Sequence, residues 1–319
     1  MRISNRSSVA VLITGMLVCL WPVITAAEAL IFGLAVGLAG LNSWTSKTTT
    51  YASKLLQISI VGLGAGMNLA VIWAVGLSSI GYTVIGITFT LALGWWLGRR
   101  QGLSRNLTLL ISSGTAICGG SAIAAVACVL KPKEEEMTAA LATVFLLNAV
   151  GLLVFPVLSH VFGFSQHEFG LWAALAIHDT SSVVGAGASY GDTALKVATT
   201  VKLTRALWIV PLTLAIAWTL ARVNRQMVPT PPKVKFPWFI AGFLATAALA
   251  TYLPAFADIA PYISTAAKRL LVVALFLVGA NLSRPALRAV GWKPLAVGVT
   301  LWITVSIVVA GAIELGWIR

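Results

Sequence analysis

The stretch AIHDTSSVVGAG, residues 176–187, places a histidine and an aspartate side by side within a long apolar part of the chain. Three hydroxyl residues and two glycines follow them. Ionisable side chains are costly in an apolar medium, and glycine weakens a helix. The stretch therefore raises the question of which medium surrounds it and what its polar groups do there.

The composition answers the first half of that question. Of the 319 residues, 59% are hydrophobic and only 10% are charged, whereas soluble domains carry about 25% charged residues. Apolar runs recur along the whole length, each long enough for the roughly 20 residues that a helix needs to cross a bilayer. The sequence predicts an all-α polytopic membrane protein and contains no stretch that could form a separate soluble domain.

We expect eleven membrane segments and one distinctive connection. The connection, residues 223–236, is rich in proline and basic residues, as linkers between helix bundles often are. It separates residues 1–222 from residues 237–319. The expected segments cover residues 8–26, 29–41, 53–72, 79–98, 105–130, 135–158, 168–187, 193–221, 237–254, 260–282 and 292–315.

The basic residues of the connections predict the orientation. Fourteen of them fall on the side of the N-terminus: Arg2, Arg6, Lys47, Lys54, Arg99, Arg100, Arg105, Arg222, Arg225, Lys233, Lys235, Arg284, Arg288 and Lys293. The other side receives three, Lys131, Lys133 and Arg319. Basic loops stay in the cytoplasm. We therefore expect a bacterial inner-membrane protein with a cytoplasmic N-terminus and a periplasmic C-terminus.

Several partners are not expected. The net charge of +13 is spread over short loops, where topology explains it without a nucleic-acid partner. The three cysteines form no CxxC pair, and the ligand spacing of a metal site is missing, so we expect neither a metal nor a cofactor. The first segment resembles a signal peptide, but we expect it to be retained. The sequence does not determine the oligomeric state, for which a homodimer is the working hypothesis.

Counting residues along the predicted helices places four ionisable residues at the same depth in the membrane. His178 and Asp179 lie about ten residues into their segment, which is roughly 15 Å along a helix and near the middle of a core about 30 Å thick. Lys202 and Arg205 reach the same depth on the next segment. One reading is a buried network that only joins two helices. The other is an anion and proton pathway, because one aspartate cannot neutralise two cations. His178 and Asp179 would then couple transport to H⁺ or Na⁺.

A second stretch, SSGTAICGGSAIAA at residues 112–125, interrupts another segment with glycines and hydroxyl residues. Close helix packing through small residues is one explanation. The other is a helix broken at mid-membrane, whose free N–H groups face a ligand. Residues 279–281 are a weaker third candidate for a break. Besides Lys202 and Arg205, the expected anion-binding residues are Ser112, Ser113, Gly114, Thr115, Cys118, Gly119, Gly120, Ser121, Thr180, Ser181 and Ser182.

Internal similarity is weak but present. SKLLQISIVGLGAGMNLA, residues 53–70, is similar to KRLLVVALFLVGANLS, residues 268–283. Both stretches run from a basic residue and Leu-Leu to small residues and Asn-Leu. Weak similarity of this kind is the usual trace of inverted repeats in transporters, although the two stretches do not occupy equivalent positions in a scheme of one helix plus two repeats of five.

Three motifs, in this order, resemble a known family: GTAICGGSAIAA (residues 114–125), AIHD (176–179) and VKLTRALWIVP (201–211). They are similar to the YeiH-type, sulfate-exporter-like family of bacterial inner-membrane proteins, and the resemblance covers most of the chain. It implies ten or eleven helices, inverted five-helix repeats with crossed broken helices, and a sulfate-like anion as substrate. The chain has His178-Asp179 followed by two serines where we expect His-Glu and an Ala-Gln-like pair, so its substrate or coupling ion can differ.

Three functions compete. A secondary anion transporter, ion-coupled and working by alternating access, is the leading hypothesis, and an anion channel is the alternative. A membrane hydrolase would use Cys118 or Ser121 as nucleophile and His178 as base. However, the sequence GGSAI lacks the last glycine of a nucleophile elbow, and adjacent residues on a helix point about 100° apart. We therefore expect that the protein is not an enzyme.

Overall fold

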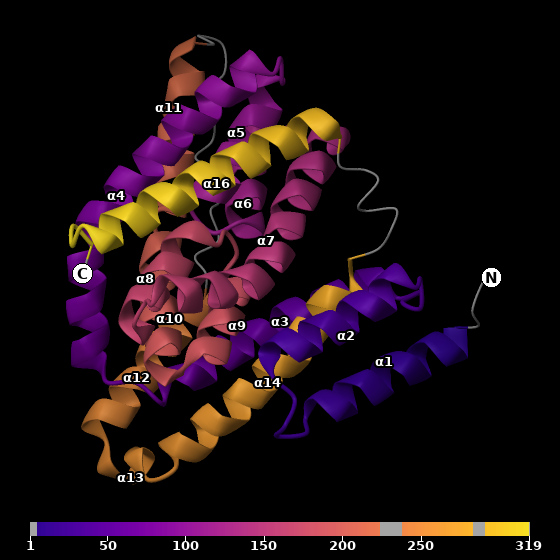
Figure 1. Ribbon diagram of the computed structural model, residues 1–319, viewed down its shortest axis with the longest axis vertical. Coiled ribbons are helices and arrows are strands. Elements are labelled where there is room, and N and C mark those ends of the chain that lie inside the picture. Colours follow the sequence, from indigo (N-terminus) through magenta and orange to yellow (C-terminus); the bar gives the residue numbers. More distant parts are fainter. Residues whose placement is uncertain (1–4, 224–237, 283–290, 319) are drawn as a thin grey trace.

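The structure, a computed structural model, describes residues 5–223, 238–282 and 291–318 (Figure 1). Five helices in these ranges are long and apolar enough to cross a membrane, which confirms the predicted helical membrane class. Apart from Val223, the predicted linker 223–236 lies outside the described residues. The helices are α1 (Asn5–Cys19), α2 (Ala26–Leu38), α3 (Thr45–Gly64), α4 (Leu69–Arg100), α5 (Arg105–Ala116), α6 (Gly120–Leu130), α7 (Glu134–Phe162), α8 (Gln166–Ala176), α9 (Thr180–Tyr190), α10 (Asp192–Ala206), α11 (Ile209–Val223), α12 (Trp238–Tyr252), α13 (Pro254–Ala257), α14 (Ala260–Ala280) and α16 (Trp292–Glu314).

The helices pack in two groups. In the scaffold group, α14 packs against α1, α2 and α3, and α12 packs against α3. Small residues allow the close approach: a Cβ added to Gly33 of α2 would lie 2.0 Å from the carbonyl oxygen of Phe276 in α14. The hairpin group contains α4 to α11 and α16. In Figure 1, α1, α2, α3 and α14 lie together on one side, below α4, α5 and α16.

The two internally similar stretches, residues 53–70 and 268–283, cover parts of α3 and α14 that are neighbours in the scaffold group. Gly62 of α3 lies against Ala267 of α14, and near the other end Thr48 Oγ1 donates to Asn281 Oδ1 over 2.5 Å. The two helices are therefore antiparallel. Helix α14 ends at Ala280, with Asn281 as its C-cap; because residues 283–290 lie outside the described ranges, the third predicted break, at residues 279–281, stays a prediction.

The segment predicted to cross the membrane over residues 105–130 is a hairpin instead. Helix α5 ends at Ala116, the chain turns, and α6 runs back beside α5, so that Gly114 lies against Ile123. The N-cap of α5, Ser104, donates its hydroxyl to Glu136 in the first turn of α7. Both ends of this hairpin, called hairpin 1, thus lie near the start of α7.

Residues 166–190 form a second hairpin, made of α8 and α9 and called hairpin 2. Phe169 near its start stacks on Tyr190 at its end, with ring centroids 4.0 Å apart. The Tyr190 hydroxyl also donates to the carbonyl of Phe164 over 2.6 Å, and Ser159 near the end of α7 donates to that hydroxyl. Both ends of hairpin 2 therefore lie near the end of α7.

The two hairpins enter the protein from opposite ends. Helix α7 has 29 residues and is therefore roughly 40 Å long. Hairpin 1 begins and ends at one end of α7, and hairpin 2 begins and ends at the other. The prediction of crossings at residues 105–130 and 168–187 is wrong, because each segment turns back halfway. The interruption that the glycines and polar residues predicted is present in both.

The order of elements makes two inverted units. Each consists of a long helix followed by a hairpin: α4 with hairpin 1, and α7 with hairpin 2. A serine caps the first hairpin helix in both units, Ser104 in α5 and Ser165 in α8. The turns also align: AICGGS, residues 116–121, and AIHDTS, residues 176–181, share Ala, Ile and Ser at an offset of 60 residues (176 − 116).

Candidate functional site

The turn of hairpin 1 depends on glycine. Ile117 leaves the helical conformation, and Gly119 adopts φ +65 and ψ −127. This region is open to glycine and strained for any residue with a Cβ. The N–H of Gly119 donates to the carbonyl of Gly114 over 2.8 Å. A Cβ on Gly119 would lie 3.2 Å from the Cβ of Asp179, so the tips of the two hairpins meet here.

The turn of hairpin 2 is held by polar side chains. Asp179 is the N-cap of α9, and its carboxylate accepts from the N–H of Ser181 at 3.0 Å and from the Ser181 hydroxyl. The amide oxygen of Asn148 accepts from the backbone N–H groups of His178 and Asp179 at 3.1 and 3.0 Å. Asn148 lies at the middle of α7, so it holds the tip midway between the two ends of that helix.

Two buried cations of α10 close the junction from one side. Lys202 Nζ donates to the carbonyls of Ala174 and Ile177 at 3.2 and 2.7 Å. Arg205 donates from Nε to the carbonyl of Ala116 at 2.6 Å and from Nη1 to that of Leu175 at 2.5 Å. These carbonyls are at or just beyond the C-terminal ends of α5 and α8. The last carbonyls of a helix have no helical N–H partners and carry partial negative charge. Arg205 joins the two hairpins.

The charges at the junction do not cancel. Each helix end carries about half an elementary charge, positive at the N-terminus and negative at the C-terminus. Two C-termini (α5 and α8) and two N-termini (α6 and α9) meet at the junction, so their contributions offset one another. Counted at their formal charges, Lys202, Arg205 and Asp179 then leave one net positive charge. An anion bound at the junction would neutralise it.

His178 is one of three buried polar residues near the junction with side-chain atoms that lack a hydrogen-bond partner among the described residues. Its side chain is 1% exposed, and neither ring nitrogen has a hydrogen-bond partner among the described residues. The amide nitrogen of Asn148 and the hydroxyl of Thr115 are also buried without a partner there. Buried polar groups are normally bonded to protein or water. These groups therefore have capacity for water, a proton or a ligand.

The sequence is similar to those of known proteins over most of its length. The family model described as conserved hypothetical protein 698 matches residues 7–298, which include both hairpins and α10. The chain belongs to the UPF0324 membrane protein family. One UPF0324 member, from Bdellovibrio bacteriovorus, is 50% identical over 95% of this chain and 93% of its own length. Another, from Geobacter sulfurreducens, is 48% identical over 94% of each chain. No solved structure matches the chain.

In this UPF0324 protein, the junction gathers only part of the predicted site. Cys118, Gly119, His178, Asp179, Lys202 and Arg205 come together there. Thr180, Ser181 and Ser182 form the buried first turn of α9. Ser112 and Ser113 instead donate to carbonyls of their own helix, those of Thr108 and Leu110. Gly114 only lets α6 approach α5. These last three residues are packed within their helices, and their expected role in anion binding stays a prediction.

The junction reaches the surface of the UPF0324 protein on the side of α6. Ser121 is exposed, and Asp179 and Gly120 are half-buried. The α6 helix begins directly at this point, after Gly119, which has no side chain to cap it. Helix N-termini with uncapped N–H groups bind anions. The accessible part of the junction therefore presents N–H groups, a hydroxyl and one carboxylate.

Sequence reasoning missed Asn148 and the inverted units. Asn148 lies alone in an apolar helix, and nothing local indicates that it bonds a turn about 30 residues away. The units had a usable signal in the shared Ala-Ile and Ser of the two turns and in the serine that precedes each hairpin. Comparing the two interrupted segments with each other would have detected it.

Proposed function

We propose that this UPF0324 protein is a secondary transporter of a small anion, with a sulfate-like oxyanion as the expected substrate. The observation that carries the proposal is the junction of two hairpins that enter from opposite ends and leave one net positive charge between them. Irregular backbone at membrane depth is tolerated only where it lines a site or is buried in protein. Discontinuous helices of this kind form the central sites of secondary transporters.

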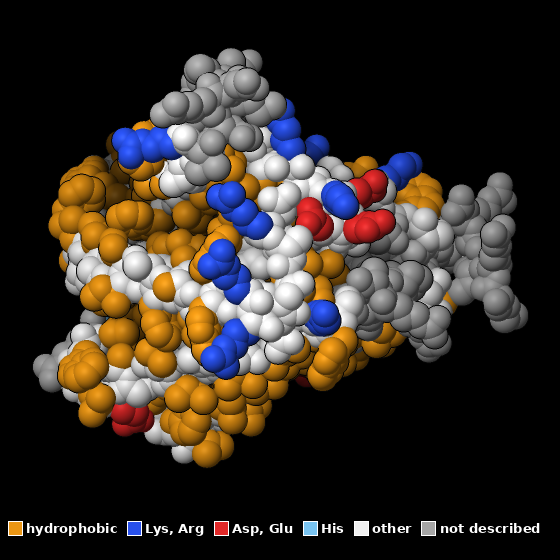
Figure 2. Space-filling model, turned by 90° about the horizontal axis from the view of Figure 1, so that it is seen from above, with side chains coloured by type: hydrophobic (Ala, Val, Ile, Leu, Met, Phe, Trp, Pro, Cys, Tyr) orange, Lys and Arg blue, Asp and Glu red, His pale blue; other side chains and the backbone are white. Residues whose placement is uncertain are grey.

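The hairpins also bring the proposed orientation into better agreement with the rule that basic connections lie in the cytoplasm. With hairpin 1 entering from the cytoplasm, Lys131 and Lys133 join the basic residues on the cytoplasmic side instead of facing the periplasm. Figure 2 shows Lys and Arg side chains following one another across one face, with hydrophobic side chains on both sides. Three arginines near helix ends stack on tryptophans of their own helices: Arg99 on Trp95, Arg100 on Trp96 and Arg222 on Trp218. Such aromatic and basic pairs suit a membrane interface.

The coupling ion would act at the tip of hairpin 2. Neither ring nitrogen of His178 is bonded within the described residues, and Asp179 beside it is half-buried at the accessible side of the junction. Protonation of either side chain adds one positive charge next to the anion site. Protons and anions would therefore bind cooperatively, which is what symport of the two requires.

The two alternatives receive less support from the geometry. A hydrolase needs a nucleophile within hydrogen-bond reach of its base, and the ring of His178 contacts no such group among the described residues. A channel needs a continuous polar path, whereas Lys202 and Arg205 are buried and bonded across the junction. Alternating access fits a closed junction better.

Flux measurements in proteoliposomes test the proposal. The protein is reconstituted, a pH gradient is imposed, and uptake of radiolabelled sulfate is followed against protein-free vesicles. We expect uptake that depends on the gradient and saturates with sulfate. Vesicles with the Asp179→Asn variant should lose the dependence on the gradient. Sulfate conductance that needs no gradient would support the channel instead, and absence of flux for sulfate and other small oxyanions would refute anion transport.

A further inference from the structure

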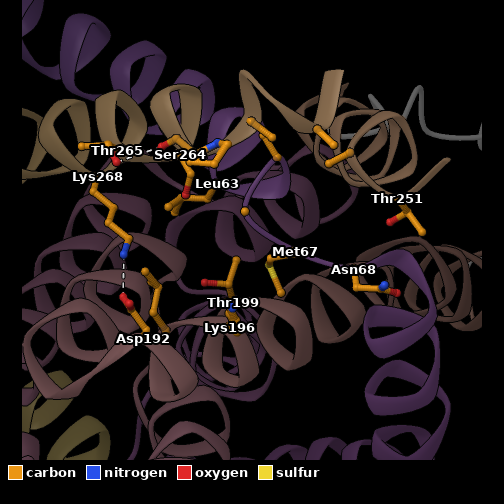
Figure 3. Close-up of a pocket in the computed structure, with 17 residues that line it drawn as sticks. Leu63, Met67, Asn68, Asp192, Lys196, Thr199, Thr251, Ser264, Thr265 and Lys268 are labelled. Carbon is orange, nitrogen blue, oxygen red and sulfur yellow. Dashed lines mark hydrogen bonds and ion pairs between the residues drawn. The ribbon is translucent and has the colours of Figure 1, made fainter. Parts of the chain in front are cut away.

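A polar cavity of about 540 Å³ lies between the two helix groups, away from the hairpin junction (Figure 3). The scaffold group contributes the ends of α3 and α12 and the start of α14, and the hairpin group contributes the first two turns of α10. The start of α10 is bonded to the base of hairpin 2, since the N–H of Thr193 donates to Gln166. In the proposed orientation the cavity is therefore on the periplasmic side.

The cavity has a surplus of positive charge. Lys268 of α14 extends across it to Asp192 of α10, with 2.5 Å between Nζ and Oδ1 (Figure 3). Lys196 lies one helical turn after Asp192 and makes no ion pair with any described residue. Two lysines and one aspartate leave one net positive charge. The N-terminal ends of α10 and α14 and the C-terminal ends of α3 and α12 border the same space, so their opposite partial charges offset one another and the surplus rests on the lysines.

The lining offers hydrogen-bond donors as well as charge. Ser264 of α14 lines the cavity, whereas the hydroxyls of Thr265 and Thr251 already donate to the carbonyls of Pro261 and Ala247 in their own helices. Thr199 of α10 is 1% exposed, and its hydroxyl has no hydrogen-bond partner within the described part of the chain. Lysines and hydroxyl groups together match the several acceptor oxygens of a small oxyanion.

The cavity leads toward the hairpin junction but is closed from it. Thr199 is three residues before Lys202 on α10, less than one helical turn. An apolar cluster lies between the cavity and the tip of hairpin 1. It includes Met67, which also lines the cavity, together with Leu203 and Ile117. Because the cluster is apolar, an anion could be held in the cavity without reaching the junction.

We propose that this cavity is a periplasmic vestibule that binds a small oxyanion through Lys196 and Lys268. When no anion is bound, Lys268 pairs with Asp192. A bound anion takes the place of Asp192 as the partner of Lys268. Because Lys268 and Asp192 belong to different helix groups, anion binding breaks the one ion pair found within the described residues and frees the groups to move apart. The direction of entry rests on the proposed function, but the binding site itself does not.

Cysteine accessibility tests this site without a transport assay. Cys19 and Cys118 are buried and Cys128 is exposed, so Cys128→Ser supplies a background without an exposed thiol. Thr265→Cys places a thiol in the cavity, and Tyr262→Cys places one on the exposed side of the same helix, 77% exposed and outside the cavity. Each variant is reacted, with and without inorganic sulfate, with the anionic sulfonatoethyl or the cationic trimethylammonium-ethyl methanethiosulfonate.

The cavity thiol should prefer the anionic reagent several-fold over the cationic one, relative to the Tyr262→Cys control. Sulfate should slow its modification and leave the control unchanged. Lys196→Gln and, independently, Lys268→Gln should remove both effects, whereas Asp192→Asn should lower the sulfate concentration needed for protection several-fold. Chloride at equal ionic strength controls for screening.

Equal rates for the two reagents, with no protection by sulfate, would overturn the vestibule. Thr251→Cys, on α12, gives a second position should Thr265→Cys fail to fold. If protection is found but proteoliposomes show no anion flux, the vestibule stands and the proposed transport function falls. If flux is found without protection, transport stands and the vestibule is refuted.

Discussion

Gly119 and Asp179 meet where hairpin 1 and hairpin 2 touch: a Cβ on Gly119 would lie 3.2 Å from the Asp179 Cβ. The two residues occupy equivalent places in the aligned turns AICGGS and AIHDTS. One is a glycine with positive φ and the other a carboxylate that caps a helix. The contact leaves little room for a side chain between the two turns.

Gly119→Ala should therefore destabilise the protein and reduce transport. A backbone with φ +65 and ψ −127 is sparsely populated by residues with a Cβ and costs an alanine about 1 to 3 kcal/mol, and the added methyl group also pushes on Asp179. Gly102→Ala is the matched control, since Gly102 has φ +68 and open space around it. Thermal unfolding in detergent should show a larger loss for Gly119→Ala than for Gly102→Ala. Equal losses would mean that the tip contact contributes nothing.

Arg205 should be needed for the fold rather than for anion binding alone. Removing its side chain leaves the carbonyls of Ala116 and Leu175 without their donors, at a cost of about 1 to 3 kcal/mol for each unsatisfied buried group. Arg205→Lys should also destabilise the protein, because one ammonium group does not reproduce the fork that joins both hairpins. Arg222→Ala, which removes an arginine stacked on exposed Trp218, is the surface control in the same melting experiment. A wild-type melting temperature for Arg205→Ala would show that the bridge is dispensable.

The two hairpins predict on which side of the membrane Glu134 and Thr193 lie. In a Cys128→Ser background, Glu134→Cys should resist a membrane-impermeant thiol reagent added to intact cells, because the proposed orientation puts both ends of hairpin 1 in the cytoplasm. Thr193→Cys, at the base of hairpin 2, should react. Eleven consecutive crossings predict labelling at both positions, so reaction of Glu134→Cys in intact cells would contradict the hairpin topology.

The pH dependence of transport should depend on His178. His178→Gln keeps a neutral side chain of similar length but cannot titrate, so the pH profile of sulfate uptake should become flat. His160→Gln is the control, because His160 lies near the base of hairpin 2, stacked on Tyr190. The same pH profile in His178→Gln as in the wild type would exclude this histidine as the coupling group and leave Asp179 as the remaining candidate.

The sequence by itself determined the membrane class, the helix boundaries of most segments and the two interruptions. These features are local: apolar length predicts a helix in a bilayer, and Gly119 or Asp179 interrupts one whatever surrounds it. It also placed Lys202, Arg205, His178 and Asp179 at one depth, because helical rise is uniform.

Only the tertiary structure decided whether each interrupted segment crosses or turns back. A broken crossing helix and a hairpin have the same apolar length, so hydropathy does not separate them. The direction after the break is set by contacts such as Gly114 with Ile123 and Tyr190 with Phe169. The roles of Arg205 and Asn148 were decided in the same way, because their partners are backbone groups, which every residue type carries and which only the folded chain brings within reach.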